Sequence, residues 1–248
     1  MRRGVLALTV LTLCGFTALA QQTIESVEKE VEQLWAKTNS FTANVTTDTT
    51  VAIGPATMKS LATGTMQVLK EGEKSYFKID MLNKIDTGVP VAGTLEQKIL
   101  SVFDGKEMFN EMEAMGMKQV YRMSPEDSEK QAPLTGKSMI ESLRRQGELK
   151  LLPDASVDGK PTYVIEVTPN PETKSAAPSP ISIMRTYISK ELGLQVKMEV
   201  IDEKGAPMST TVYKDIKINV PLTPAEFAYV VPEGVKVQDM SELKKLQP

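Results

Sequence analysis

The sequence predicts an α+β fold in which a single curved antiparallel sheet forms an incomplete, open β-barrel with an N-terminal helix against it. Three observations predict this fold: a helical apolar period over residues 24–35, apolar–polar alternation through much of the remaining chain, and glycine-containing turns between the alternating segments. A sheet with one apolar face must cover that face, and curling toward a barrel beneath a helix does so. We expect one domain over residues 21–248, because no linker interrupts the chain.

The first predicted element is an amphipathic helix of about four turns. Thr23 is a plausible N-cap, and glutamate and lysine residues occupy the positions between the apolar ones. We interpret Trp35 as a core anchor that holds this helix on the sheet. The apolar face consists of Ile24, Val27, Val31, Leu34 and Trp35.

The segments after this helix alternate with the period of β-strands. In one of them, Phe77, Ile79 and Met81 alternate with Lys78 and Asp80, so the three apolar side chains share a face. Turns containing glycine separate several of these segments, which is typical of an antiparallel meander. The alternating segments are residues 41–46, 65–68, 77–81, 163–167, 194–200 and 211–219.

Two segments depart from the strand pattern. Pro133–Gly147 carries apolar residues at near-helical spacing with charged residues between them, which predicts a short second helix. Pro169–Pro180 is rich in proline, serine, threonine and alanine, and we predict an exposed loop there.

The N-terminus has the layout of a secretory signal peptide. Arg2 and Arg3 are followed by an apolar stretch at Val5–Phe16 and a small-x-small cleavage site at Ala18–Ala20. The apolar stretch is too short to span a bilayer. We therefore expect residues 1–20 to be a signal peptide that is cleaved after Ala20, and the mature protein to be periplasmic.

Cys14 allows a second interpretation, in which the cysteine is acylated as in a lipoprotein. A lipoprotein signal has a small residue directly before its cysteine, whereas Leu13 is large. We favour cleavage after Ala20. Acylation of Cys14 would instead indicate an outer-membrane acceptor lipoprotein.

The composition excludes several kinds of site. The chain contains no histidine, and its one cysteine lies in the predicted signal peptide, so disulfides, Cys/His zinc sites and histidine-dependent nucleophiles are excluded. Neighbouring carboxylates such as Glu111 and Glu113 lie in no catalytic motif. The formal net charge is −3 and no basic patch is present, which argues against nucleic acid as a partner. We expect no enzymatic activity, no cofactor and no metal site.

Methionine is the most informative local feature. Met108, Met112, Met115, Met117 and Met123 crowd into residues 108–123. Methionine is unbranched and polarizable, so such a cluster suits a surface that must fit variable apolar shapes. Irregular core packing explains the cluster, taken alone, slightly better than ligand binding does, and thioether binding of copper(I) is a third interpretation.

Three parts of the chain resemble the LolA-like periplasmic lipoprotein carriers. Val102–Phe109, continuing to Lys118–Met123, is similar to the family's "DGK" hairpin, and Ile188–Asp239 is similar to its C-terminal stretch. The N-terminal helix followed by Ser40–Val45 also fits the family's opening. Together these segments span much of the mature chain in order.

The resemblance implies an incomplete barrel with helices over an apolar cavity that binds lipoprotein or lipid acyl chains. It also implies transfer from an inner-membrane transporter to an outer-membrane acceptor, and we expect a monomer. Strand parity and the methionine cluster give the candidate cavity lining: Phe77, Ile79, Met81, Phe103, Met108, Phe109, Met112, Met115, Met117, Met139, Ile140 and Leu143.

The sequence departs from the family pattern in two places. Residues 69–73 have no Arg-Pro pair, which in the family helps to keep the lid shut, and Met108-Phe109 replaces the usual aromatic after "DGK". Lid control and partner docking can therefore differ. An alternative function is an envelope sensor or scaffold of the same fold that binds a regulatory protein.

Overall fold

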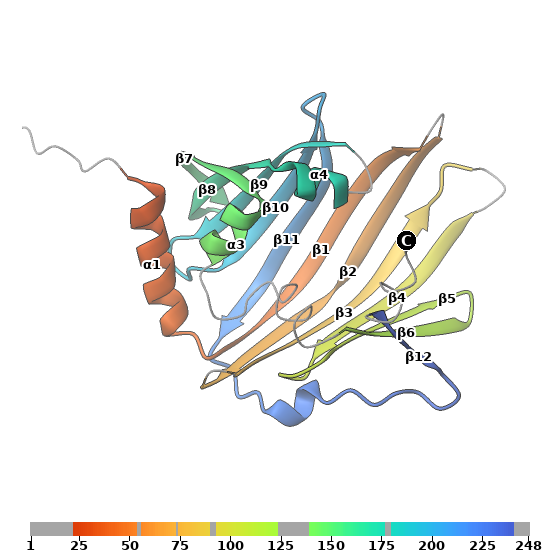
Figure 1. Cartoon of the computed structure of the whole chain (residues 1–248). Helices are drawn as coiled ribbons and strands as arrows, with labels where there is room; N and C mark the ends of the chain where they lie inside the picture. Colours follow the sequence, from red (N-terminus) through yellow and green to blue (C-terminus); the bar gives the residue numbers. More distant parts are fainter. Residues whose placement is uncertain are drawn as a thin grey trace, which may run out of the picture.

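The computed structural model describes residues 22–53, 56–72, 74–89, 93–123, 139–176 and 180–240. Within these ranges the chain forms four helical segments and one sheet of 12 strands (Figure 1). In chain order the elements are α1 (Ile24–Ala36), β1 (Ser40–Ile53), β2 (Ala56–Glu71), β3 (Lys74–Asp86), β4 (Thr94–Phe103), β5 (Met108–Ala114), β6 (Met117–Met123), α3 (Met139–Gln146), β7 (Gly147–Val157), β8 (Lys160–Pro169), α4 (Pro171–Ala176), β9 (Ile181–Ser189), β10 (Gln195–Asp202), β11 (Pro207–Ile218), the 3₁₀ turn η1 (Pro224–Phe227) and β12 (Val237–Asp239).

The sheet consists of two antiparallel meanders joined side by side. Its strand order is β12-β6-β5-β4-β3-β2-β1-β11-β10-β9-β8-β7, so the pairing of β1 with β11 connects the first half of the chain to the second. Only β12 pairs in parallel, with β6. The described sheet is curved and remains open, because β12 and β7 lie at opposite edges (Figure 1). The predicted α+β class with one open curved sheet and an N-terminal helix is confirmed.

Strand register divides the sheet into two faces. We call the face on which α1 and α3 pack the inner face, and the opposite one the outer face. Val45 on β1 pairs with Gly64 on β2 and Tyr213 on β11, so these residues share the inner face. A Cβ at Gly64 would lie 1.9 Å from the carbonyl oxygen of Asp80. Glycine is therefore required for the close approach of β2 and β3.

Helix α1 begins where the sequence predicts. The Thr23 hydroxyl accepts a hydrogen bond from the Ser26 backbone N–H at 3.2 Å, and the Ser26 hydroxyl accepts one from the Thr23 N–H at 3.0 Å, which makes a reciprocal cap. Val27 and Val31 are buried on the inner face of β8 and β9. The amphipathic pattern of the sequence therefore identifies the buried side of this helix correctly.

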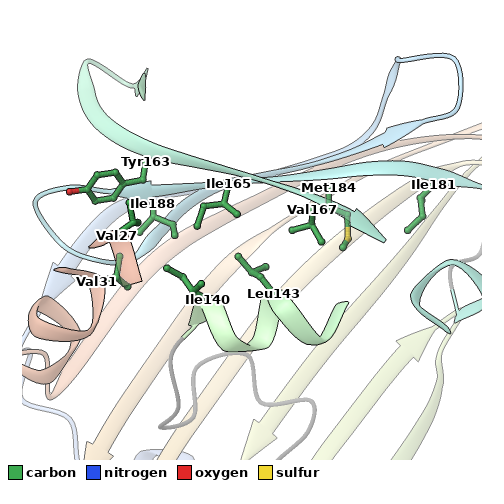
Figure 2. Packing of buried hydrophobic residues seen from close by; sticks show 10 residues of the cluster. All are labelled: Val27, Val31, Ile140, Leu143, Tyr163, Ile165, Val167, Ile181, Met184 and Ile188. Carbon is green, nitrogen blue, oxygen red and sulfur yellow. The ribbon is translucent and has the colours of Figure 1, made fainter. Parts of the chain in front are cut away.

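Helix α3 lies over the same strands and confirms the predicted second helix over residues 139–146. Residues 133–138 of that prediction lie outside the described residues. Ile140 and Leu143 point from α3 toward the sheet (Figure 2). The contacting set, which we call the helix cluster, is Val27, Val31, Ile140, Leu143, Tyr163, Ile165, Val167, Ile181, Met184 and Ile188.

The exposed loop predicted at Pro169–Pro180 is wrong for residues 171–176, which form α4. Asn170 caps this helix, because its side-chain oxygen accepts a hydrogen bond from the Thr173 N–H at 2.8 Å and its carbonyl accepts one from the Lys174 N–H at 3.0 Å. Pro171 follows the cap, a position that proline favours. The proline that indicated a loop starts a helix instead.

The C-terminal segment covers part of the outer face. Phe227 in η1 is fully buried against Tyr76, with 5.7 Å between the ring centroids, and it also packs with Leu69 and Val102. Farther along, β12 pairs with β6 and protects that edge of the sheet. Residues 222–240 therefore pair with one edge of the sheet and cover part of its outer face.

Replacing Ile140 with alanine should lower the free energy of unfolding by about 2–5 kcal/mol, because a fully buried aliphatic side chain is truncated between α3 and the sheet. Urea unfolding followed by circular dichroism measures this loss. Val230→Ala is the matched control, since Val230 is 82% exposed, and should change stability by less than about 0.5 kcal/mol. A loss below about 1 kcal/mol for Ile140→Ala would contradict the described packing of α3.

Candidate functional site on the inner face of the sheet

A second apolar cluster occupies the inner face of the first meander. It is built largely from alternate residues of β1 to β6, which the strand register aligns in rows across the sheet. In one row, Phe77 pairs with Val68 and Phe103, and Met108 pairs with Phe103 and Met123. This methionine cluster contains buried Phe41, Val45, Met66, Val68, Phe77, Phe103, Met108, Met123 and Leu194, with partly buried Trp35, Ile79, Met81, Leu192, Tyr213, Ile216 and Met240 packed against it.

Thioethers give this cluster a deformable surface. Met66, Met108 and Met123 are buried in it and Met81 is half-buried. Two amide groups contact methionine sulfur on the same face: Gln97 Nε2 donates to Met112 Sδ at 3.7 Å, and Asn110 Nδ2 donates to Met123 Sδ at 3.6 Å. Because methionine has several accessible rotamers and a polarizable sulfur, such a surface can reshape around different apolar molecules at low cost.

Nine of the predicted cavity residues lie on the inner face or on the helix that packs over it, in two groups. Phe77, Ile79, Met81, Phe103 and Met108 belong to the methionine cluster, and Met112 lies on the same face, paired with Ile99. Met139, Ile140 and Leu143 on α3 belong to the helix cluster or pack against it. That these residues contact a ligand remains a prediction.

The other three predicted lining residues lie outside these two groups. Phe109 points to the outer face, where it stacks on Tyr229 with 4.8 Å between ring centroids. Met115 and Met117 are 79% and 66% exposed at the tip of the β5–β6 hairpin. Met115 (φ 53°) and Gly116 (φ 74°) form a two-residue turn with both φ angles positive, as tight hairpins require. Proximity in sequence was misleading here, because strand alternation and the turn separate neighbouring residues.

Sequence reasoning missed several members of the methionine cluster. Phe41, Val45 and Met66 lie in segments whose alternation was recognised, so strand parity alone could have placed them on the inner face. Leu194 is buried next to the β9–β10 turn. Its place in the cluster depends on the packing of that turn against the end of α1, which no local pattern indicates.

Lys70 holds the C-terminal end of α1 against the methionine cluster. Its Nζ donates a hydrogen bond to the Trp35 carbonyl oxygen at 2.6 Å and lies 4.2 Å from the centre of the Trp35 ring. Burial lowers the pKa of Lys70. Trp35 in turn meets Phe41 edge to face, with 6.2 Å between centroids. Lys70 lies in the part of β2 that lacks the family's Arg-Pro pair, and its ammonium group anchors the end of α1 there.

Tyr163 attaches the middle of α1 to β8. The Tyr163 hydroxyl donates a hydrogen bond to the Glu30 carboxylate, and the ring is buried in the helix cluster. Burial, followed by the hydrogen bond to Glu30, raises the pKa of Tyr163 to about 12. This hydrogen bond between β8 and α1 therefore requires a protonated phenol.

Among the residues that the structure describes, no helix is long and apolar enough to cross a membrane. Over the same ranges, no group of three or more His, Cys, Asp or Glu side chains comes together where it could hold a metal ion.

The fold is similar to that of an uncharacterised conserved protein from Thermus thermophilus. The TM-score is 0.53 at 14% sequence identity, and the match covers 88% of this chain and 99% of that one. At this identity the likeness is one of fold alone. The sequence itself matches no protein-family model and no curated protein.

Two further solved structures match with TM-scores below 0.5. The lipoprotein LppX of Mycobacterium tuberculosis has a TM-score of 0.41 at 12% identity, over 81% of this chain and 99% of that one. A LolA superfamily protein of Nitrosomonas europaea has a TM-score of 0.33 at 15% identity, over 84% of this chain and 98% of that one. The single open, curved sheet that the sequence resemblance implies is the fold described above.

Alkaline pH should lower the free energy of unfolding of the protein, because the Tyr163 phenol loses its proton. Its pKa is about 12 in the folded protein and about 10 in an unfolded chain, so its contribution to stability is complete below pH 10 and is lost as the pH rises through 12. The midpoint of urea unfolding, measured from pH 9 to 12, should fall less steeply in Tyr163→Phe than in the wild type. Identical slopes for the two proteins would contradict this assignment.

Proposed function

We propose that the protein is a non-enzymatic carrier of the bacterial envelope that binds the acyl chains of lipids or lipoproteins on the inner face of its sheet. The single observation that carries the proposal is the methionine cluster, an extended apolar surface with deformable thioethers on one side of an open sheet. The resemblance to LolA-like carriers adds the expectation of export, cleavage after Ala20 and a periplasmic location.

The energetic task of such a carrier sets the requirements for its binding surface. Exposing an acyl chain to water costs roughly 0.8 kcal/mol per methylene, so a chain of about fifteen methylenes costs about 12 kcal/mol. A carrier must offset much of this cost yet still release its ligand. Half-buried side chains such as Ile79 and Met81, which can cover a chain or pack against one another, suit both requirements.

The helices complete the proposed site from one side. α1 and α3 pack together on β8 and β9, and Arg144 of α3 forms an ion pair with Glu28 of α1 at 2.6 Å. This ion pair links the two helices, which lie beside the methionine cluster. A joint movement of α1 and α3 would widen access to the inner face without breaking the sheet.

Directional transfer is the finer part of the proposal. By the family resemblance, the carrier would receive its cargo from an inner-membrane transporter and deliver it to an outer-membrane acceptor, acting as a monomer. The alternative, a sensor that binds a regulatory protein, would not require the inner face to take up a hydrocarbon chain. Ligand uptake therefore separates the two functions.

Met81→Lys should weaken binding of a fluorescent fatty-acyl probe at least about tenfold, because a lysine ammonium on the apolar inner face must be desolvated or must displace the chain. Fluorescence titration of the purified protein measures the dissociation constant. Met115→Lys is the matched control: Met115 is exposed at the hairpin tip, and its replacement should leave probe affinity unchanged.

Two outcomes would count against the proposal. A wild-type protein that takes up no acyl probe would refute acyl-chain binding. Equal losses of affinity in Met81→Lys and Met115→Lys would show that the probe binds somewhere other than the inner face.

A further inference from the structure

A band of polar side chains crosses the inner face beside the methionine cluster. Cross-strand register places one residue from each of the seven strands β9, β10, β11, β1, β2, β3 and β4 in a single row, and the row is polar on all of these strands except β10 and β2. The row reads Thr186, Met198, Thr211, Thr47, Ala62, Asn83 and Gln97. A second polar pair, Thr49 and Ser209, lies next to it on β1 and β11.

The hydroxyls of this polar band bond in pairs, and each pair leaves one donor without an acceptor among the described residues. Thr47 Oγ1 lies 2.9 Å from Thr211 Oγ1, and Thr49 Oγ1 lies 3.0 Å from Ser209 Oγ. A hydroxyl carries one hydrogen and two acceptor lone pairs, so each pair uses one hydrogen and leaves the other. Thr47, Thr49 and Ser209 are half-buried and Thr211 is buried. The pairs thus offer hydrogen-bond donors within the apolar face.

Two buried polar atoms in the same row have no hydrogen-bond partner in the described part of the chain. These are Thr186 Oγ1, on a side chain with no solvent exposure, and Asn83 Oδ1. Buried polar groups in native proteins are almost always satisfied, and each exception calls for an explanation. Thr186 lies at the β9 end of the row and Asn83 near its β4 end, with the hydroxyl pairs between them, so the row carries polar atoms that the described residues leave without a partner.

The polar band directly borders the apolar surface that would hold a chain. On β1, Val45 of the methionine cluster precedes Thr47 by two residues on the same face, and on β3, Met81 stands in the same relation to Asn83. Two residues along a strand span roughly 7 Å. A chain lying on the cluster would therefore bring its first polar atoms to the band.

We propose that this polar band binds the ester or amide linkage of an acylated ligand, with its carbonyl oxygen accepting a hydrogen bond from the Thr47–Thr211 pair and a neighbouring polar atom of the ligand contacting the Thr49–Ser209 pair. The inference rests on the proposed function and deepens it. The preferred ligand is an acyl ester or amide whose chain lies on the methionine cluster, and a plain hydrocarbon of equal length binds more weakly.

The test compares two pyrene-labelled probes of equal chain length, a monoacylglycerol ester and an alkane, by fluorescence titration. Thr47→Val with Thr211→Val removes the hydroxyls while keeping the branched shape, and should weaken binding of the ester about fivefold or more while changing alkane affinity less than twofold. Thr46→Val is the control, because Thr46 neighbours Thr47 on β1 but is exposed on the outer face. It should alter neither affinity.

The outcomes separate this inference from the proposed function. A wild type that binds neither probe refutes both. A wild type that binds both probes, with unchanged ester affinity in the double variant or equal losses for ester and alkane, overturns the polar-band assignment alone. The single variant Thr49→Val, which leaves the Thr47–Thr211 pair intact, gives the same test with a smaller loss if the double variant does not fold.

Discussion

The packing of α1 and α3 on β8 and β9 is the interaction on which the rest of the structure depends. Strand register makes one face of a 12-strand sheet largely apolar. Within the described residues, α1 and α3 cover this face mainly at the β7–β9 end. An apolar surface of this kind is stable in water only when something lies on it. The methionine cluster, on the other half of the same face, combines buried side chains with half-buried ones such as Ile79 and Met81, and the half-buried ones are where the proposed ligand would pack.

The pairing of β1 with β11 connects these two halves. It joins residues about 170 positions apart, such as Val45 and Tyr213, and it includes a register shift between Thr42 and Asn44. Among the described strands, β1 and β11 are the pair through which the two meanders hydrogen-bond, so the relation between the helix cluster and the methionine cluster depends on this pairing. The two hydroxyl pairs lie in this junction, so the proposed polar subsite forms only when both halves of the chain have folded together.

Local patterns predicted the fold well. The helical period from Ile24 to Trp35 and the alternation through Phe77–Met81 each identified an element and its buried side, because period and parity are properties of short segments. The loop expected after Pro169 failed because one asparagine cap outweighed a composition typical of loops. Phe109 was misplaced because a cluster in sequence was treated as a cluster in space, whereas consecutive strand residues face opposite sides.

The candidate site was less accessible to sequence reasoning than the fold. No segment of the chain reveals that Thr47 pairs with Thr211 or that Asn83 and Thr186 share a row, since those relations arise from the pairing of distant strands. Conversely, Met108 and Met123 of the methionine run do lie together in an apolar cluster, and the adaptability of that cluster toward a ligand stays a prediction.

Native mass spectrometry of protein purified gently from the bacterial envelope tests the central claim most directly. If the inner face holds an acylated ligand, the protein should carry an added mass that is released on denaturation and is identified by lipid analysis as an acyl ester or amide. A protein that leaves the envelope with no added mass, and that gains none when incubated with lipid extract, would contradict the account.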